Sequence, residues 1–279
     1  MPSTDALLYS VADRVATLTL NRPDKLNALT GSMIAAFIEA LDEADRDDEV
    51  RAVVVRGEGR CFCVGADLSA GSATFDYAEA DTRDAGGLLT LRLYRCLKPV
   101  IAAVHGAAAG AGVTMTLAMD ARFAATDARF GLVFTRRGIV PESASAWFLQ
   151  RIVGLDRALD WCLSGRLVGA DEALHAGLVR SLHRPEDLLQ AAYAHAAEIA
   201  QHTSPVSVAL TRQMLWRMAG AADPMEAHRL DSRAVQSRGR SADAREGIAS
   251  FLEKRSPVFP DKVSRDMPGF FPWWTEAGF

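Results

Sequence analysis

Two turns of the sequence combine glycine with alanine in a way that suits the stabilisation of an anionic oxygen. Residues 63–68 (CVGADL) follow a short β-branched run, and residues 105–112 (HGAAAGAG) lead from an apolar stretch into a helical one. Glycine lets the backbone approach a ligand closely, and free N–H groups at a helix start attract anions. Two such amides can form an oxyanion hole. The residues alone are equally typical of two tight turns in a packed α/β body.

Other reactive side chains give weaker signals. Residues 110–112 begin like a dinucleotide-binding motif, but Met115 occupies the place of its third Gly or Ala. Cys61 and Cys63 are separated by one residue rather than the two of a zinc or thioredoxin pair. The histidines show no metal-ligand spacing, and we expect His105 to be a packed or hydrogen-bonded residue. We therefore expect no metal site.

Short β-branched or alternating runs, separated mostly by helical stretches, give the α/β pattern. A helix is predicted over residues 30–44, with Thr30 as its N-cap. Residues 71–87 show little apolar periodicity and are expected to form a mobile surface loop. The predicted strands are residues 15–21, 51–56, 98–104, 121–126 and 177–182.

The strand pattern stops after about residue 184. Helices are predicted over residues 185–201, 205–219, 224–237 and 242–254, three of which open with proline. Residues 268–279 are rich in aromatic side chains, so we expect them to pack on the chain's own body or on a neighbouring subunit. We therefore divide the chain into a core over residues 1–200 and a C-terminal helical oligomerisation region with an aromatic tail over residues 201–279.

The composition excludes several classes of protein. The chain has 279 residues, 49% hydrophobic and 24% charged, which is typical of a folded protein. A formal net charge of −4 argues against a general nucleic-acid or anionic-membrane binder. Residues 100–119 have the length of a membrane span, but Ala and Gly dominate them and His105 interrupts them, so we reject a span. Four cysteines make no disulfide framework, and residues 1–10 resemble no secretory signal, so a cytoplasmic location is expected.

An ordered set of motifs resembles the crotonase (enoyl-CoA hydratase/isomerase) family. Each motif is weak alone, but their order and spacing over about residues 8–257 are specific. The motifs are NRP at 21–23, LNAL at 26–29, GADL at 65–68, AVHG at 103–106, GAG at 110–112 leading to Asp120, FG at 130–131, GIVP at 138–141, GR at 165–166, Ala173, GLV at 177–179, AREG at 244–247 and FLEKR at 251–255.

This resemblance implies a fold, a substrate class and an assembly. The family folds as a spiral of ββα turns, so the expected fold class is α/β, a crotonase-like spiral core with a C-terminal helical region. Family members associate as trimers or paired trimers through that region. They bind acyl-CoA thioesters, so coenzyme A is expected as part of the substrate, with no separate cofactor.

The resemblance also assigns site residues. The two amides that hold the thioester oxygen correspond to Ala66 and Ala111, the latter at a position that is usually glycine. Backbone around Leu26 and Ala28 would meet the adenine end of coenzyme A. Lys254, from this chain or a neighbouring subunit, would lie near its phosphates, although its spacing equally fits a solvated helix charge. The remaining residues assigned to substrate binding are Gly65, Asp67, Leu68, Gly110, Thr114 and Phe134; Asp67 and Asp120 are also expected to anchor turns.

Two departures from the family's hydratase pattern bear on the reaction. Hydratases of the family use two glutamates to activate water, and this sequence has Thr114 and Phe134 in their places. Neither side chain is a general base near neutral pH, so two-glutamate hydration is not expected. Glu142 follows Pro141 at the place where several isomerases of the family carry an acidic base. The same residues also fit the first turn of a helix, where Glu would favour the dipole.

A single carboxylate suits the migration of a double bond. It can remove a proton from C2 of a 3-enoyl-CoA and return it at C4, with no water activated. Burial near Phe134 and Trp147 would raise the pKa of Glu142 towards neutrality and improve it as a base. We therefore predict conversion of 3-enoyl-CoA to 2-enoyl-CoA with Glu142 as the acid/base. The alternatives are an enoyl-CoA hydratase, an acyl-CoA hydrolase, and a non-catalytic acyl-CoA binder.

Overall fold

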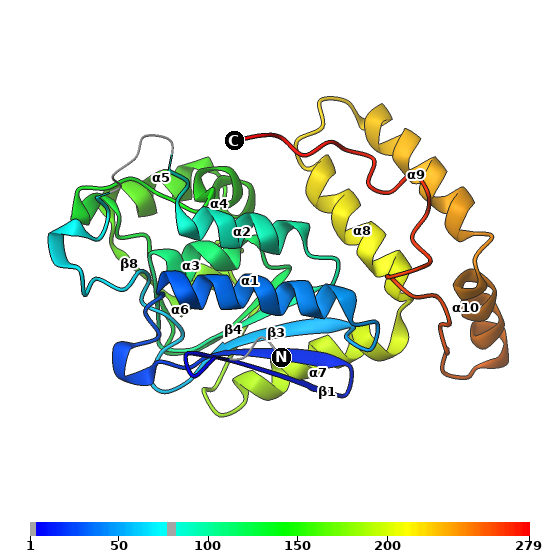
Figure 1. Ribbon diagram of the computed structural model, residues 1–279, viewed down its shortest axis with the longest axis horizontal. Coiled ribbons are helices and arrows are strands. Elements are labelled where there is room, and N and C mark those ends of the chain that lie inside the picture. The colour runs from blue at the N-terminus through cyan, green and yellow to red at the C-terminus, as the bar shows by residue number, and fades with distance from the viewer. Residues whose placement is uncertain (1–3, 77–81) are drawn as a thin grey trace.

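The computed structural model describes residues 4–76 and 82–279, and a six-stranded sheet forms its centre (Figure 1). The strands follow the order β1-β2-β3-β4-β6-β9, and every neighbouring pair except β1–β2 is parallel. The central strands are buried on both faces, as parallel strands covered by helices must be. The strands are β1 (Leu7–Ala12), β2 (Val15–Leu20), β3 (Ala52–Gly57), β4 (Val100–Val104), β6 (Ala121–Ala125) and β9 (Ser181–His183).

A second sheet of three short strands accompanies the first. It contains β5 (Ala107–Ala109), β7 (Arg129–Gly131) and β8 (Leu167–Gly169), in that order. Strand β4 leads directly into β5, and β6 leads directly into β7. Each of these two segments therefore contributes one strand to the large sheet and one to the small sheet. Gly106 makes the turn between β4 and β5 with a φ of +55°, a conformation that favours glycine. The chain therefore winds as repeated strand–strand–helix turns.

Helices cover both faces of the large sheet. Alternate side chains of β3 point to opposite faces: Val53 and Val55 join the core that includes α1, whereas Val54 packs in the cluster that includes α7. Helix α1 begins after Thr30, whose side chain accepts a hydrogen bond from Met33 N. The helices of this part are α1 (Gly31–Arg46), α2 (Ala85–Arg95), α3 (Ala111–Thr114), α4 (Ser145–Val153), α5 (Leu155–Ser164), α6 (Ala170–His175) and α7 (Leu188–His202), with 3-10 turns η1 (Pro23–Lys25), η2 (Gly71–Ala73), η3 (Met115–Ala118) and η4 (Thr135–Arg137).

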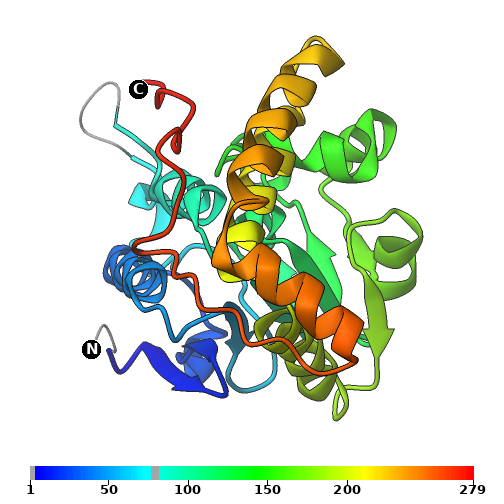
Figure 2. The ribbon, with the colours of Figure 1, turned by 90° about the vertical axis from the view of Figure 1, so that its right-hand side faces the viewer.

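Helices α8 (Pro205–Met218), α9 (Pro224–Arg238) and α10 (Ala242–Glu253) lie at one end of the molecule, where Figure 2 views them from the front. The aromatic tail returns from α10 towards α2. The Arg217 guanidinium stacks on the Trp274 ring at 3.2 Å, and Glu276 pairs with Arg95 at 2.9 Å. The tail thus packs on the chain's own body, the first of the two arrangements expected from its sequence.

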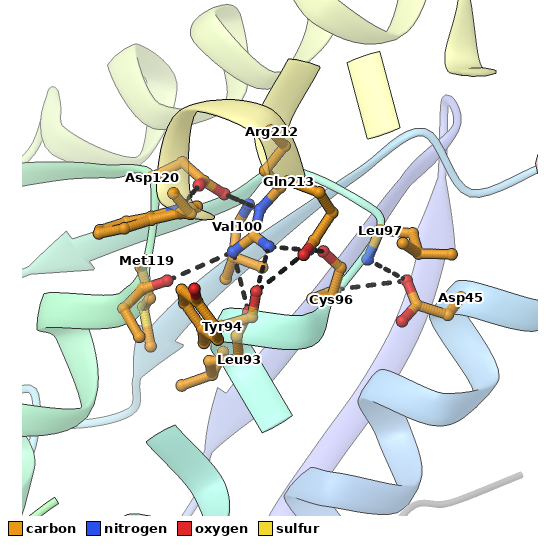
Figure 3. A network of polar contacts seen from close by, with 12 residues as sticks. Asp45, Leu93, Tyr94, Cys96, Leu97, Val100, Met119, Asp120, Arg212 and Gln213 are labelled. Carbon is orange, nitrogen blue, oxygen red and sulfur yellow. Dashed lines mark hydrogen bonds and ion pairs between the residues drawn. The ribbon is translucent and has the colours of Figure 1, made fainter. Parts of the chain in front are cut away.

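Arg212 docks α8 onto the rest of the fold (Figure 3). Its guanidinium is buried and donates to the carbonyl oxygens of Leu93 (2.8 Å), Tyr94 (2.9 Å) and Cys96 (2.5 Å) at the end of α2. It also pairs with Asp120 (2.8 Å), whose carboxylate accepts from Val100 N (2.7 Å) in β4. Asp120 therefore anchors its turn, as predicted, and joins that turn to α8.

The structure confirms most predicted elements and corrects some. Of the strand predicted at residues 177–182, only Ser181–His183 forms, and α7 begins at Leu188, so Pro185 lies outside it. Strands β1, β5, β7 and β8 escaped prediction. Residues 71–87 were predicted to form a loop, but they include a 3-10 turn and the start of α2 at Ala85. Residues 77–81 of this range lie outside the described part of the chain. No helix among the described residues is long and apolar enough to cross a membrane.

Candidate active site

The two glycine turns run beside each other. Cys63 and Ala108 form a parallel bridge, and the Cys63 carbonyl accepts a hydrogen bond from Ala109 N (2.9 Å). A Cβ at position 112 would collide with the Cys63 carbonyl oxygen, so glycine is required there for the two backbones to come this close. The structure therefore joins the two motifs that the sequence separates by about forty residues.

The amides of Ala66 and Ala111 are free donors in these turns. Neither N–H group donates a hydrogen bond within residues 4–76 and 82–279. A Cβ on Gly65 would lie 3.4 Å from the Ala111 nitrogen, which shows how close the two turns are. Gly110, just before α3, takes the positive φ of this turn (+52°), and Ala111 does not. Ala111 therefore starts the helix without strain at the position where glycine was expected, and its N–H is available.

Residues 26–29 lie against the first of these turns. Leu29 donates its N–H to the Gly65 carbonyl (2.7 Å), and the Leu29 carbonyl accepts from Asp67 N (2.9 Å). The Leu26 backbone is left-handed, with a φ of +52°, so the chain turns sharply before it joins this ladder. The structure thus brings together four residues assigned to substrate binding: Leu26, Ala28, Gly65 and Asp67.

Arg22 and Asp67 fasten this region. Their side chains pair at 2.8 Å, and the Arg22 guanidinium also donates to the Ala28 carbonyl (2.6 Å). Hydrogen bonds from Ser69 and from Arg22 hold the pKa of Asp67 down at about 2. Asp67 therefore stays ionised near neutral pH and anchors its turn, as predicted. Leu68 follows it with 54% of its surface exposed.

Glu142 lies against the single turn of α3. One carboxylate oxygen accepts from the Thr114 hydroxyl at 2.5 Å, and the other accepts from the Ser143 hydroxyl. Thr114 is the last residue of α3, which starts at Ala111, and its hydroxyl also lies 3.3 Å from the Gly110 carbonyl. Thr114 thus links the carboxyl group to the helix turn that presents the Ala111 amide.

The backbone around Glu142 excludes a simple helix-dipole role. Helix α4 begins only at Ser145, and the Glu142 carbonyl accepts from Ser145 N (3.0 Å). Ser143 and Ala144 have left-handed backbones, with φ of +58° and +52°. Each such residue costs about 1 kcal/mol or more, and it persists where the surroundings over-determine it. The turn directs the carboxylate to Thr114 and Ser143 instead of placing it in the first turn of α4.

The surroundings of Glu142 raise its pKa above the ordinary value of a glutamate. Burial is the largest cause, and the Asp84 carboxyl group acts in the same direction. The hydroxyls of Ser143 and Thr114 act in the opposite direction because they stabilise the ionised form. A Cβ at Gly86 would collide with the Glu142 carboxylate, so the first turn of α2 packs directly on it. The predicted direction of the shift is confirmed.

Asp84 was missed by the sequence analysis. It is the N-cap of α2, and its Oδ1 accepts from Gly87 N (2.5 Å) and from Ser143 N (3.2 Å). An Asp before a helix start is a recognisable N-cap signal, which could have identified its local role. Its contact with the residue after Glu142 is distant in sequence and gives no local signal.

Comparison with known proteins settles the relationship of the chain. The sequence profile of enoyl-CoA hydratases/isomerases matches residues 11–262. The chain belongs to the enoyl-CoA hydratase/isomerase family. The crotonase-like α/β fold implied by the motifs is therefore confirmed, and acyl-CoA thioesters are the substrates consistent with this family.

Similar proteins carry names of both reaction types. This family member is 41% identical over 253 residues to an enoyl-CoA hydratase of Alternaria alternata, with 90% of this chain and 85% of that protein covered. It is 36% identical over 273 residues to a 1,2-epoxyphenylacetyl-CoA isomerase of Escherichia coli, with 92% and 98% covered. The crystal structure of an enoyl-CoA hydratase from Polaromonas superposes with a TM-score of 0.85 at 30% identity and covers 91% of this chain and 99% of that one.

Two more predicted residues of the hydratase/isomerase family member have different surroundings. Phe134 is buried just before η4, with 4% of its surface exposed, in the core that also contains Val113 of α3. Lys254 is an exposed residue at the end of α10, which lies at the opposite end of the molecule from α3 and α4 (Figure 1). One chain therefore does not bring Lys254 to Glu142.

Groups expected to be chemically inactive also have clear positions. His105 Nε2 lies 2.9 Å from the Gly59 carbonyl, so this residue is hydrogen-bonded as predicted. Among residues 4–76 and 82–279, no three His, Cys, Asp or Glu side chains gather closely enough to hold a metal ion.

A hollow of about 380 Å³ lies between α2 and the tail, lined by Tyr94, Arg217 and Phe279 among others. Neither Glu142 nor the amides of Ala66 and Ala111 line it.

Proposed function

We propose that this enzyme shifts the double bond of a 3-enoyl-CoA to the 2-position. The observation that carries the proposal is the half-buried carboxylate of Glu142. It is held by Thr114 beside the helix turn that begins with the free Ala111 amide. A base and an oxyanion hole in one place are the two elements that proton abstraction next to a thioester requires.

The reaction needs one base and no external reactant. The Ala66 and Ala111 amides would hold the thioester oxygen, which lowers the pKa of the protons at C2. The Glu142 carboxylate takes one C2 proton, and the electron pair of that bond enters a dienolate whose charge rests on the thioester oxygen. The Glu142 carboxylic acid then returns the proton at C4, and the 2-enoyl thioester forms. Substrate and product have the same atoms, and the enzyme returns to its starting state.

The raised pKa of Glu142 supports this role. A carboxylate with an ordinary pKa is a weak base, whereas a pKa nearer the working pH serves both proton removal and proton return. Thr114 and Ser143 donate to both oxygens of the carboxyl group and fix its orientation. These contacts favour an acid/base that stays in one place through both steps.

Hydration is the second candidate function. The hydratase names of similar proteins, such as the one from Alternaria alternata, favour it. Asp84 also supplies a second carboxyl group next to Glu142, and its Oδ1 accepts from two backbone amides. Thr114 and Phe134 still occupy the places where hydratases of the family carry their glutamates.

Turnover of matched substrates in D₂O separates these functions. The wild type is expected to convert 3-enoyl-CoA to 2-enoyl-CoA with deuterium entering at C2 or C4. Glu142→Gln should lose about 10²–10⁴-fold in kcat, the usual contribution of a general acid/base. Glu198→Gln, which changes an exposed glutamate on α7, is the matched control and should retain full activity.

Each other product identifies an alternative. Full isomerase activity in Glu142→Gln would show the one-base mechanism to be wrong. Formation of 3-hydroxyacyl-CoA from 2-enoyl-CoA, without isomerisation, would establish a hydratase, and release of free coenzyme A would establish a hydrolase. Tight acyl-CoA binding without turnover of any substrate would establish a non-catalytic acyl-CoA-binding protein.

The proposal includes the assembly that the family resemblance implies. Large apolar side chains are exposed on the C-terminal helices, among them Val235 (70%) and Phe251 (81%). Such side chains are typical of subunit contacts, so trimers or paired trimers are proposed. A phosphate contact by Lys254 would then come from a neighbouring subunit. Coenzyme A takes part as a portion of the substrate, with no separate cofactor.

A further inference from the structure

We propose that Asp84 is a positioning residue for Glu142, and that the two carboxyl groups act as a pair on either side of Gly86. This inference rests on the proposed role of Glu142 as the acid/base. It adds a residue from a different element, the N-cap of α2, to the machinery that controls the proton.

Asp84 fixes the backbone next to the base. Its Oδ1 accepts from Gly87 N (2.5 Å), which caps α2, and from Ser143 N (3.2 Å). Ser143 is the first of the two left-handed residues after Glu142, so its conformation needs an external restraint. The Asp84 carboxylate supplies that restraint from across the site and holds the turn that orients the Glu142 side chain.

Gly86 allows the two carboxyl groups to come together. A Cβ at this position would collide with both the Glu142 carboxylate and the Ser143 hydroxyl, and it would lie 3.3 Å from Asp84 Oδ1. The two carboxyl groups thus border the same small space. Within the described part of the chain, neither forms an ion pair with Lys, Arg or His. Two like charges therefore meet here without a cation between them.

The groups that face Glu142 predict the effect of this arrangement. The Thr114 hydroxyl of α3 and the Ser143 hydroxyl of the turn after Glu142 donate to the Glu142 carboxyl group. The Asp84 carboxyl group at the start of α2 is its titratable neighbour among the described residues. Two carboxylates that share a site resist double ionisation, so one proton remains on the pair to a higher pH. The carboxylic acid form of Glu142, which returns a proton at C4, is then favoured over the ionised form. Asp84 itself exchanges no proton with the substrate.

Asp84→Asn tests the pairing while keeping the positioning. The amide oxygen can still accept from Gly87 N and Ser143 N, but the charge is gone. We expect the acid limb of the kcat profile to move to lower pH, and kcat on the plateau to fall by less than in Glu142→Gln. Asp223→Asn is the matched control, because Asp223 caps α9 by accepting from Met225 N (2.7 Å) and is remote from the site. Its pH profile should equal that of the wild type.

The outcomes separate this inference from the function on which it rests. If Glu142→Gln is inactive but Asp84→Asn has the wild-type acid limb, the pairing is wrong and the function stands. If Glu142→Gln is fully active, the proposed function fails and the pairing fails with it. Asp84→Ser, which keeps an N-cap oxygen without charge, repeats the test if the Asn variant misfolds.

Discussion

The two ends of α2 carry buried polar clusters of opposite character. At the C-terminal end, Arg212 is enclosed by carbonyl oxygens and paired with Asp120 (Figure 3). At the N-terminal end, Glu142 has two hydroxyl partners, a carboxylate neighbour in Asp84 and no cation among the described residues. One cluster satisfies its charge and holds helices together. The other leaves its charge disfavoured, at a cost in stability that the rest of the fold offsets.

The difference appears in the preferred protonation states. Burial opposes the charge of Arg212, but Asp120, Cys96 and Asp45 together outweigh it and raise the pKa of the guanidinium, so this group stays charged. For Glu142, burial and Asp84 both favour the neutral acid. A carboxyl group with a raised pKa exchanges its proton closer to neutral pH than an ordinary one, which is why perturbed acids cluster at functional sites. Breaking each cluster should therefore have different consequences.

The largest effect on stability is expected from Arg212→Met. Removing one partner of a buried ion pair leaves Asp120 and several carbonyl oxygens without their donor, which costs about 3–5 kcal/mol. Urea unfolding measures the loss, and the protein that remains folded should retain the pH profile of activity. Arg166→Met is the control: Arg166 pairs with Asp160 and Glu172 at the surface, so its loss should cost much less stability. Equal losses in the two variants would contradict the comparison.

The next largest effect is expected from a substitution of Thr114, whose effect on the pKa of Glu142 is opposite to that of Asp84. Thr114→Val removes a donor to the ionised form of Glu142, so the pKa of that carboxyl group should rise further. A hydrogen bond to a charged group contributes about 1.5–3 kcal/mol, so kcat/KM on the acid side of the pH profile should fall by roughly tenfold or more. The acid limb should move to higher pH, opposite to Asp84→Asn.

Thr116→Val is the matched control for that measurement. Thr116 is equally buried, but its hydroxyl donates to the Val113 carbonyl (2.7 Å) and has no contact with Glu142. Its acid limb should not move. If both Thr variants shift the limb equally, the effect belongs to helix packing and not to the hydrogen bond.

Local sequence signals predicted the frame of the site and the turns within it. The β-branched run at 51–56 and the N-cap at Thr30 gave β3 and α1, because strand period and capping are properties of neighbouring residues. The glycines of the two turns indicated two backbone segments, 63–68 and 105–112, which lie side by side in the structure. The family position of Glu142 identified the carboxylate, and the structure adds its burial and its partners.

Contacts between distant segments were beyond such signals. Strands β5, β7 and β8 have three residues each, which is too short for a period to show. The position of Asp84 beside Ser143 depends on how α2 packs against the turn before α4. The left-handed backbone of Ser143 and Ala144 also gave no sign, because neither residue is one of the types that favour it. The pairing that tunes the acid thus exists only in the folded chain.

The smallest effect that sharpens the comparison is a gain in stability from Glu142→Gln. The pKa of Glu142 is higher in the folded than in the unfolded state, so the folded protein binds more protons between those two values. Wild-type stability therefore falls as pH rises through this window, whereas the substituted amide side chain has no charge to bury. Thermal unfolding should show the variant gaining on the wild type, with a larger gain at pH 8 than at pH 5.

Glu246→Gln should show the opposite sign. Arg255 and the Val258 amide hold the pKa of Glu246 at about 2, so its ionised form stabilises the fold above the unfolded value and this contribution is lost as pH falls towards 2. This variant should lose stability, and more of it at pH 7 than at pH 3. If Glu142→Gln also lost stability with rising pH, its carboxylate would be stabilised by the fold, and the contrast between the two ends of α2 would fail. A gain in stability in Glu142→Gln alone would instead show that the ionised carboxylate of Glu142 destabilises the fold, as expected of a proton-exchanging base with a raised pKa.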